Sequence, residues 1–110
     1  MKPRINLWIE EEGEVVLSDW RVRLLEAIVE TGSISSAAAK LDVSYHRAWD
    51  KIREMEQGLG VKLIDAQAGG SGGGGARLTP EALDLVQKFR RFEAGFKEHV
   101  ERRFQETFGT

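Results

Sequence analysis

The stretch that decides the fold is residues 32–59, which read GSISSAAAKLDVSYHRAWDKIREMEQGL. Its three consecutive alanines are small enough to let two helices cross closely. We expect a short helix over about residues 35–41 and a longer one that begins near Ser44 and runs to about residue 57, with Gly58 ending it. Ser44 is a suitable cap, because its hydroxyl can accept a hydrogen bond from a free amide of the first turn. The sequence therefore predicts two helices joined by a tight turn.

The longer of these helices has one apolar side and one polar, aromatic side. Ala48, Ile52 and Met55 recur at helical spacing and are expected to face the core. The opposite side then carries Tyr45, His46, Trp49, Asp50 and Arg53. A helix that protrudes from a protein surface fits the DNA major groove, which is about 12 Å wide. Because such side chains can contact thymine methyls, base edges and phosphates, this side is a candidate DNA-reading surface.

Several of these side chains have a second interpretation. Trp49 can belong to the core and pack against a neighbouring element. His46 can be a solvated polar residue, and Arg47 and Arg53 can form an ordinary charged face instead of contacting phosphates. Asp50 repels phosphate but can accept a hydrogen bond from a cytosine amino group, so it would contribute specificity rather than affinity.

The residues before this stretch predict a strand pair and a first helix. Apolar residues over about residues 5–17 indicate two short strands around a polar turn at Glu12 and Gly13. Asp19, or Ser18 beside it, is a suitable cap for a helix that stops before Gly32. The apolar stripe of that helix is expected to consist of Leu24, Leu25, Ile28 and Val29.

A glycine-rich segment follows the longer helix and has three interpretations. Residues 61–66 indicate a strand, residues 68–76 are mostly glycine, and residues 77–79 indicate a returning strand. The segment is a flexible linker, a phosphate-cradling loop or the tip of a β-hairpin wing. A nucleotide-binding loop requires Gly-Lys followed by Ser or Thr, and Ala76-Arg77-Leu78 stands there instead.

The wing is the favoured interpretation of this segment. A linker is disfavoured because the single helix that follows cannot bury its own apolar stripe. In a wing, the bare backbone at Gly72 and Gly73 can approach DNA phosphates closely, and Arg77 adds a positive charge nearby.

A long helix is predicted at the end of the chain. Thr79 is a suitable cap, and Pro80 fits the first helical position, where its missing amide has no partner to lose. The helix is expected to run to about residue 104. Its apolar side chains form a narrow stripe, and they are Leu85, Phe89, Phe92, Phe96, Val100 and Phe104. Such a stripe requires a partner that covers it.

Length and composition limit the class of protein. The chain has 110 residues, of which 41% are hydrophobic and 31% charged, as is usual for a soluble globular domain. No apolar run approaches the roughly 18 residues of a membrane span, and without cysteine neither disulfides nor thiolate metal sites can form. The net charge of −2 counts against nucleic acid, but the acidic residues concentrate near the N-terminus. No recognisable catalytic arrangement exists, so we predict no enzymatic activity, no metal and no cofactor.

Several short motifs carry a resemblance to a known family. They are GSISSAAA at residues 32–39, Leu41, Val43-Ser44, Ile52, LGVKL at residues 59–63 and Leu78-Thr79-Pro80. Together they resemble the N-terminal winged helix-turn-helix of LysR-type regulators. More narrowly, Ser44-Tyr45, Ala48-Trp49-Asp50 and the glycine-rich segment before Leu78 resemble the DNA-binding domain of the molybdate-responsive ModE regulators.

This resemblance implies roles for individual residues. The residues facing the bases would be Tyr45, His46, Trp49 and Asp50, and those near a phosphate would be Ser33 and Ser35. The helix after the wing would pair with its twin through the stripe of phenylalanines. The ModE regulators sense an oxyanion in C-terminal domains that these 110 residues do not include. We therefore expect one of three cases: a separate sensor supplies the signal, the protein responds to a different effector, or it binds DNA constitutively.

The sequence predicts a mainly α-helical protein with small β-hairpins, namely a winged helix-turn-helix domain over residues 1–79 and a dimerisation helix over residues 80–110. The predicted function is that of a sequence-specific transcription regulator in the cytoplasm of a bacterium or archaeon, with double-stranded DNA and a second copy of the chain as partners. The alternative is a protein-interaction module on the same scaffold, which the acidic balance favours. The expected DNA-contacting residues are Ser33, Ser35, Ser44, Tyr45, His46, Arg47, Trp49, Asp50, Arg53, Gly72, Gly73 and Arg77.

Overall fold

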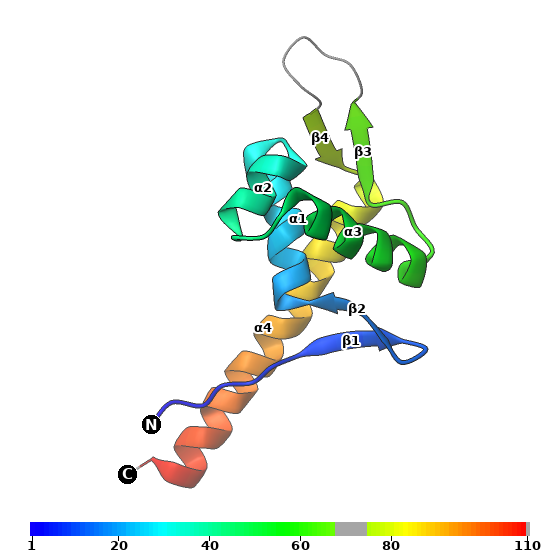
Figure 1. The fold of residues 1–110 in the computed structure, drawn as a ribbon. Coiled ribbons are helices and arrows are strands. Elements are labelled where there is room, and N and C mark those ends of the chain that lie inside the picture. Colours follow the sequence, from blue (N-terminus) through cyan, green and yellow to red (C-terminus); the bar gives the residue numbers. More distant parts are fainter. Residues whose placement is uncertain (68–74, 110) are drawn as a thin grey trace.

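The structure is a computed structural model that describes residues 1–67 and 75–109. Its elements follow in the order β1 (Trp8–Glu11), β2 (Glu14–Ser18), α1 (Asp19–Thr31), α2 (Ile34–Lys40), α3 (Tyr45–Leu59), β3 (Ile64–Gln67), β4 (Gly75–Leu78) and α4 (Pro80–Phe108). Helices α1, α2 and α3 gather with the β3–β4 hairpin at one end of the molecule, and α4 projects away from them (Figure 1). The predicted fold class, mainly helical with small hairpins and a long last helix, is confirmed.

The first hairpin forms around the predicted turn. Glu12 and Gly13 both have positive φ, at 51° and 83°, which matches the right-handed twist of a two-residue hairpin turn. Strand β1 begins only at Trp8, so Ile5 precedes it, and a register shift between Ile9 and Glu10 interrupts the pairing with β2.

Helix α1 supplies the centre of the core. Leu24, Leu25 and Ile28 are fully buried, as the apolar stripe predicts. Val29 is 56% exposed, so its assignment to that stripe was wrong. One residue turns a helix by about 100°, and this carries Val29 away from the face that Ile28 buries. The cap is Ser18 rather than Asp19, because the Ser18 hydroxyl accepts from the amide of Arg21 at 3.2 Å.

The end of α3 differs from the prediction. Gly58 lies inside the helix, which continues to Leu59 and ends at Gly60 with a φ of 70°. A Cβ atom added at Gly58 would lie 2.5 Å from Cγ1 of Val16 on β2. Gly58 therefore allows α3 to pass close to β2 instead of ending the helix.

The β3–β4 hairpin confirms two strands at the positions where the wing was predicted. Strand β3 starts at Ile64, three residues later than predicted, and pairs antiparallel with β4. The amides of Leu63 and Ile64 donate to one carboxylate oxygen of Glu56 on α3, at 2.7 and 3.4 Å. The predicted contact residues Gly72 and Gly73 lie outside the described residues.

Helix α4 is longer than predicted, and its apolar residues do not all lie on one side of the helix. Thr79 caps it, with the hydroxyl accepting from the amide of Ala82 at 3.1 Å, and Pro80 is its first residue. The expectation that all six stripe residues face a partner is wrong for Phe89, which is 1% exposed and packs against Leu17 and Val22. Successive steps of four residues rotate a helix by about 40°, so a stripe built from them drifts around the rod.

Candidate nucleic-acid interface

Helices α2 and α3 are held in a fixed arrangement by the turn between them. The amide of Val43 donates to the carbonyl of Ala38 at 3.0 Å, and Asp42 adopts a φ of 59° at the end of α2. The hydroxyl of Ser44 then accepts from the amide of Arg47 at 3.0 Å and starts α3. Ala48 and Ile52 are fully buried, so the opposite side of α3 faces outward.

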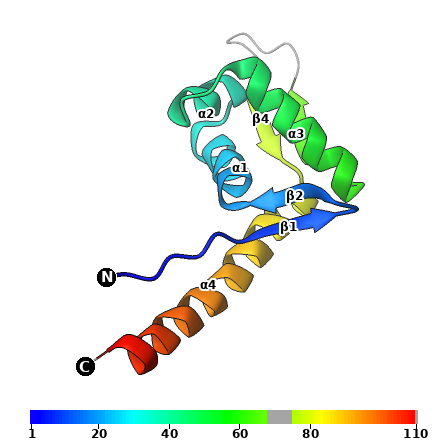
Figure 2. The same ribbon diagram turned by 60° about the horizontal axis from the view of Figure 1, so that its bottom comes forward.

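The outward side of α3 carries most of the predicted base-facing residues. Tyr45 is 55% exposed, and the side chains of His46 and Asp50 are 84% and 49% exposed. Arg47 and Arg53 are exposed as well. Figure 2 shows α3 along the right-hand edge of the molecule, with α1 to its left and α4 running away toward the lower left. We call Tyr45, His46, Trp49, Asp50 and Arg53 the reading face; their contact with DNA remains a prediction.

Trp49 combines the two roles that the sequence left open, one in the core and one on the outward side of α3. The side chain is half-buried and packs against the core cluster. Its ring also lies 6.5 Å from the ring of Tyr45, at an interplanar angle of 84°, and the guanidinium carbon of Arg53 lies 5.2 Å from its centroid. Trp49 is therefore anchored in the protein and supports an exposed cation and an exposed phenol.

The charges along α3 are divided between two sides. The Nε2 atom of His46 lies 3.5 Å from an oxygen of Asp50, one helical turn later, on the outward side. On the other side, Glu54 pairs with Arg21 of α1 at 3.0 Å and with Lys51 at 3.4 Å. The hydrogen bond from Arg21 is the main cause that holds the pKa of Glu54 below its ordinary value.

The N-terminal end of β4 lies beside the start of α2. The amide of Ala76 donates to the carbonyl of Gly32 at 2.9 Å, and these two residues line a shallow hollow together with Gly75 and Arg77. Ser33 caps α2 by accepting from the amide of Ser36 at 3.0 Å, and Ser35, the second residue of this helix, is exposed. Ser33 directly follows Gly32, so the predicted residues Ser33 and Arg77 lie on either side of this hollow, and Ser35 belongs to the first turn of α2.

The stripe of α4 is distributed over three environments. Leu85 is half-buried against the core and Phe89 is fully inside it. Phe92 and Phe96 are 49% and 44% exposed, and their rings meet edge to face with centroids 4.9 Å apart. The remaining two stripe residues are half-buried, where N-terminal residues line the neighbouring hollows: Val100 and Phe104.

Two polar anchors were missed by the sequence analysis. Glu56 ties β3 to α3, and Arg90 of α4 bonds to Asp19 and Glu26 of α1. Their partners lie from 7 to 71 residues away in the chain, so no helical or strand spacing reveals them.

None of the helices in the described part of the chain has the length and apolar surface of a membrane span. Among the same residues, no group of three His, Asp or Glu side chains could hold a metal ion.

Comparison with known proteins gives a consistent picture. Residues 20–83 match the family described as "Bacterial regulatory helix-turn-helix protein, lysR family". The chain is 45% identical over 75 residues to "Molybdenum-pterin-binding protein MopB" of Rhodobacter capsulatus, covering 68% of this chain and 28% of that protein. It is 37% identical over 89 residues to "DNA-binding transcriptional dual regulator ModE" of Escherichia coli (strain K12), covering 81% of this chain and 34% of that one. The chain thus spans about a third of the length of the curated relatives it matches.

A solved structure shares the fold. The match is to "Crystal structure of CbnR_DBD-DNA complex", with a TM-score of 0.65 and 21% identity. It covers 83% of this chain and 99% of that chain. The arrangement of α1 to α4 with the hairpin between α3 and α4 is therefore one that occurs in winged helix-turn-helix domains.

Proposed function

Since the chain belongs to the lysR family of bacterial regulatory helix-turn-helix proteins, we propose that it binds double-stranded DNA and regulates transcription, with α3 in the major groove. The observation that carries this proposal is the reading face. Exposed Tyr45, His46 and Arg53 and half-exposed Asp50 line the outward side of a helix whose other side is anchored by fully buried residues. A face of aromatic, cationic and hydrogen-bonding groups is suited to base edges and phosphates together.

The reading face and the residues around it contact different parts of the DNA in this proposal. Tyr45, His46 and Asp50 lie at the N-terminal part of α3, the part that contacts base edges when a recognition helix enters the groove. Arg47 and Arg53 provide the cations for phosphates or for guanine. Ser33, Ser35 and Arg77 lie where a phosphate strand would pass beside the start of α2 and β4.

We further propose that the chain acts as a homodimer joined through α4. The support is the pair Phe92 and Phe96, which are half-exposed on a helix that projects from the rest of the molecule (Figure 1). Apolar side chains on a projecting helix are covered when a second copy packs against them. A dimer would place two α3 helices on half-sites about one helical turn apart, or a multiple of it.

The signal that controls the regulator is proposed to act outside residues 1–110. About two thirds of the length of each curated relative has no counterpart in this chain. We expect that sensing, whether of molybdate or of another effector, belongs to such a part or to a separate protein.

The test begins with DNA selected by the protein from a random pool, followed by fluorescence anisotropy at several salt concentrations. Affinity should fall as salt rises, because phosphate contacts release counterions. Arg53→Ala should weaken binding by about 1–3 kcal/mol, which is the loss expected when one bidentate arginine contact to a guanine is removed. Arg91→Ala is the matched control, since it removes the same charge from an exposed position on α4. Salt-independent binding, or equal losses in the two variants, would contradict the proposal.

A further inference from the structure

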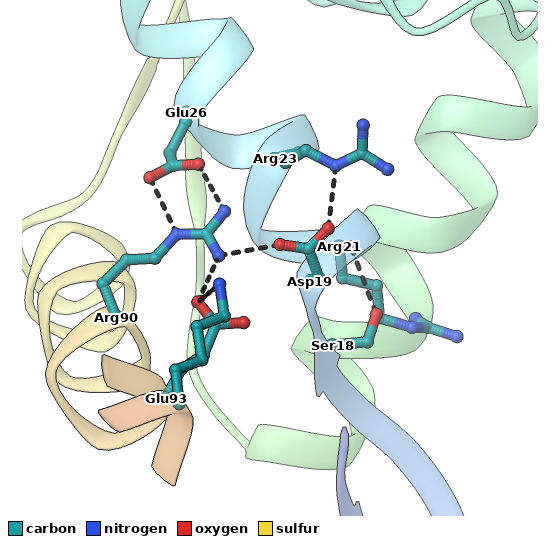
Figure 3. Close-up of polar contacts among 8 residues, drawn as sticks. Ser18, Asp19, Arg21, Arg23, Glu26, Arg90 and Glu93 are labelled. Atoms are coloured by element: carbon teal, nitrogen blue, oxygen red, sulfur yellow. Dashed lines mark hydrogen bonds and ion pairs between the residues drawn. The ribbon is translucent and has the colours of Figure 1, made fainter. Parts of the chain in front are cut away.

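A cluster of charged side chains joins α4 to α1 (Figure 3). Arg90 of α4 donates to both carboxylate oxygens of Glu26 on α1, at 2.8 Å from Nη2 and 3.2 Å from Nε. Its Nη1 atom donates to Asp19 at 2.8 Å and to Glu93 at 3.0 Å. One guanidinium group therefore binds three carboxylates, two of them on α1 and one on its own helix.

The charges of this cluster balance. Arg23 pairs with Asp19 at 3.0 Å, and Lys97 pairs with Glu93 at 3.3 Å, so three cations face three carboxylates. The side chains of Arg90 and Glu93 are only 29% and 10% exposed, which places them under less solvent screening than surface ion pairs. A planar guanidinium with a two-point bond to Glu26 also fixes direction as well as distance.

The cluster lies where α4 leaves the rest of the molecule. Phe89, next to Arg90 in the chain, is buried against Leu17 and Val22. Beyond Glu93, α4 continues through residues 94–108 as a rod that projects from the other helices. Phe89 provides an apolar contact without a preferred direction, whereas the hydrogen bonds of Arg90 are directional.

We propose that Arg90 is a positioning residue that fixes the angle between α4 and α1, and that this angle sets the spacing of the two half-sites a dimer prefers. The inference rests on the proposed function, because it takes α3 as the reader and α4 as the dimer helix. A rod of residues 94–108 is about 22 Å long, and a tilt of about 10° moves its end by about 4 Å. That displacement exceeds the step of about 3.4 Å between base pairs. If the angle between α4 and α1 varied this much, the dimer would accept half-sites at more than one spacing.

The angle can be measured without DNA. The chain contains no cysteine, so Ala39→Cys on α2 and Glu98→Cys on α4, both at exposed positions, give two unique sites for spin labels. Labelled protein is diluted with unlabelled protein, so that only the distance between the two labels of one chain is measured. The distribution of this distance is recorded by pulsed electron paramagnetic resonance. We expect a narrow distribution with Arg90 present and one about twice as broad with Arg90→Met or Glu26→Gln. Arg91→Met, an exposed neighbour on the same helix, should leave it narrow; an equally narrow distribution for Arg90→Met overturns the proposal.

The consequence for DNA is measured with the pool-selected site. The wild type should lose about tenfold or more in affinity when the spacer between half-sites changes by about two base pairs. Arg90→Met should bind a single half-site within about twofold of the wild type and lose most of this spacing preference. Unchanged spacing preference, or a parallel loss of half-site binding, overturns the role of Arg90 in spacing. A wild type that binds no DNA refutes the proposed function instead, and the spin-label distances then still decide whether Arg90 fixes the angle.

Discussion

Trp49 is the residue whose role depends most on its surroundings. The sequence left it between core and DNA, and the structure places its ring against the core with Arg53 above it at 5.2 Å. A cation over an indole face is attracted by about 0.5–1 kcal/mol at an exposed site. Trp49 therefore acts as a platform that restricts where the Arg53 guanidinium can lie.

The platform predicts coupling between Trp49 and Arg53 in DNA binding. Trp49→Leu keeps an apolar anchor but removes the aromatic face, so it should weaken binding by a factor of about two to five. Once Arg53→Ala has been made, the same change should have a smaller effect. A double-mutant cycle of anisotropy titrations measures the difference. Strictly additive losses would show that Trp49 does not position Arg53.

The carboxylate of Asp19 is expected to contribute to the free energy of unfolding, and this contribution is lost in acid. The hydrogen bond from Arg90 is the main cause that lowers the pKa of Asp19 below its ordinary value of 3.8. The folded state therefore binds this proton less readily than the unfolded state does. The resulting stability is complete above the unfolded pKa and disappears as pH falls through the folded one.

Urea unfolding at a series of pH values checks this prediction. The free energy of unfolding of the wild type should fall as pH drops below about 4, and Arg90→Met should show a shallower fall in the same range. If the two proteins have parallel pH profiles, Asp19 gains no stability from Arg90.

At the scale of the element, Gly58 determines how α3 packs on the first hairpin. Its backbone passes so close to β2 that an added Cβ atom would approach Cγ1 of Val16 to 2.5 Å. The same end of α3 is also held by polar contacts, because the carboxylate of Glu56 accepts from the amides of Leu63 and Ile64 at the start of β3. Helix α3 is thus held against a neighbouring strand on two sides.

Gly58→Ala should destabilise the protein even though alanine is the better helix former. The crowded methyl group costs about 1–3 kcal/mol, which exceeds the gain in helix propensity of about 1 kcal/mol. Gly95→Ala is the matched control, because no atom lies within 4 Å of a Cβ atom at that helical position. Urea midpoints should therefore shift down for Gly58→Ala and up for Gly95→Ala. A stabilised Gly58→Ala would show that β2 moves away without cost.

At the scale of the whole molecule, α4 makes the protein an elongated object of 60 × 28 × 22 Å. Ala82 and Phe89 of its first half belong to the core, while Phe92 and Phe96, on either side of its midpoint, are presented to solvent. The N-terminal residues lie along the same half and line hollows next to Val100 and Phe104. The surface left for a partner is therefore narrower than the full apolar stripe.

Phe92→Asp combined with Phe96→Asp should give a monomer that binds DNA poorly. Two charges would have to be buried at the proposed contact, and each half-site would then bind alone. Sedimentation velocity measures the oligomeric state at micromolar concentration. Phe108→Asp, on an exposed residue near the end of the helix, is the control and should remain a dimer. A wild type that sediments as a monomer contradicts the dimer itself.

The sequence by itself determined the local features of this protein. Helix caps at Ser44 and Thr79, the hairpin turn at Glu12 and Gly13, and the buried side of α3 were all predicted correctly. These features depend on side chains within a few residues of one another, so their spacing in the chain is sufficient to predict them.

Only the tertiary structure decided which apolar and charged residues are used inside the molecule. It placed Phe89 in the core, left Val29 exposed, and turned Gly58 from a helix end into a close contact with Val16. It also brought Arg90 to Asp19 and Glu26, which are 71 and 64 residues away. Such contacts depend on where helices cross, and a helical period fixes the face of a residue but not the element that this face meets.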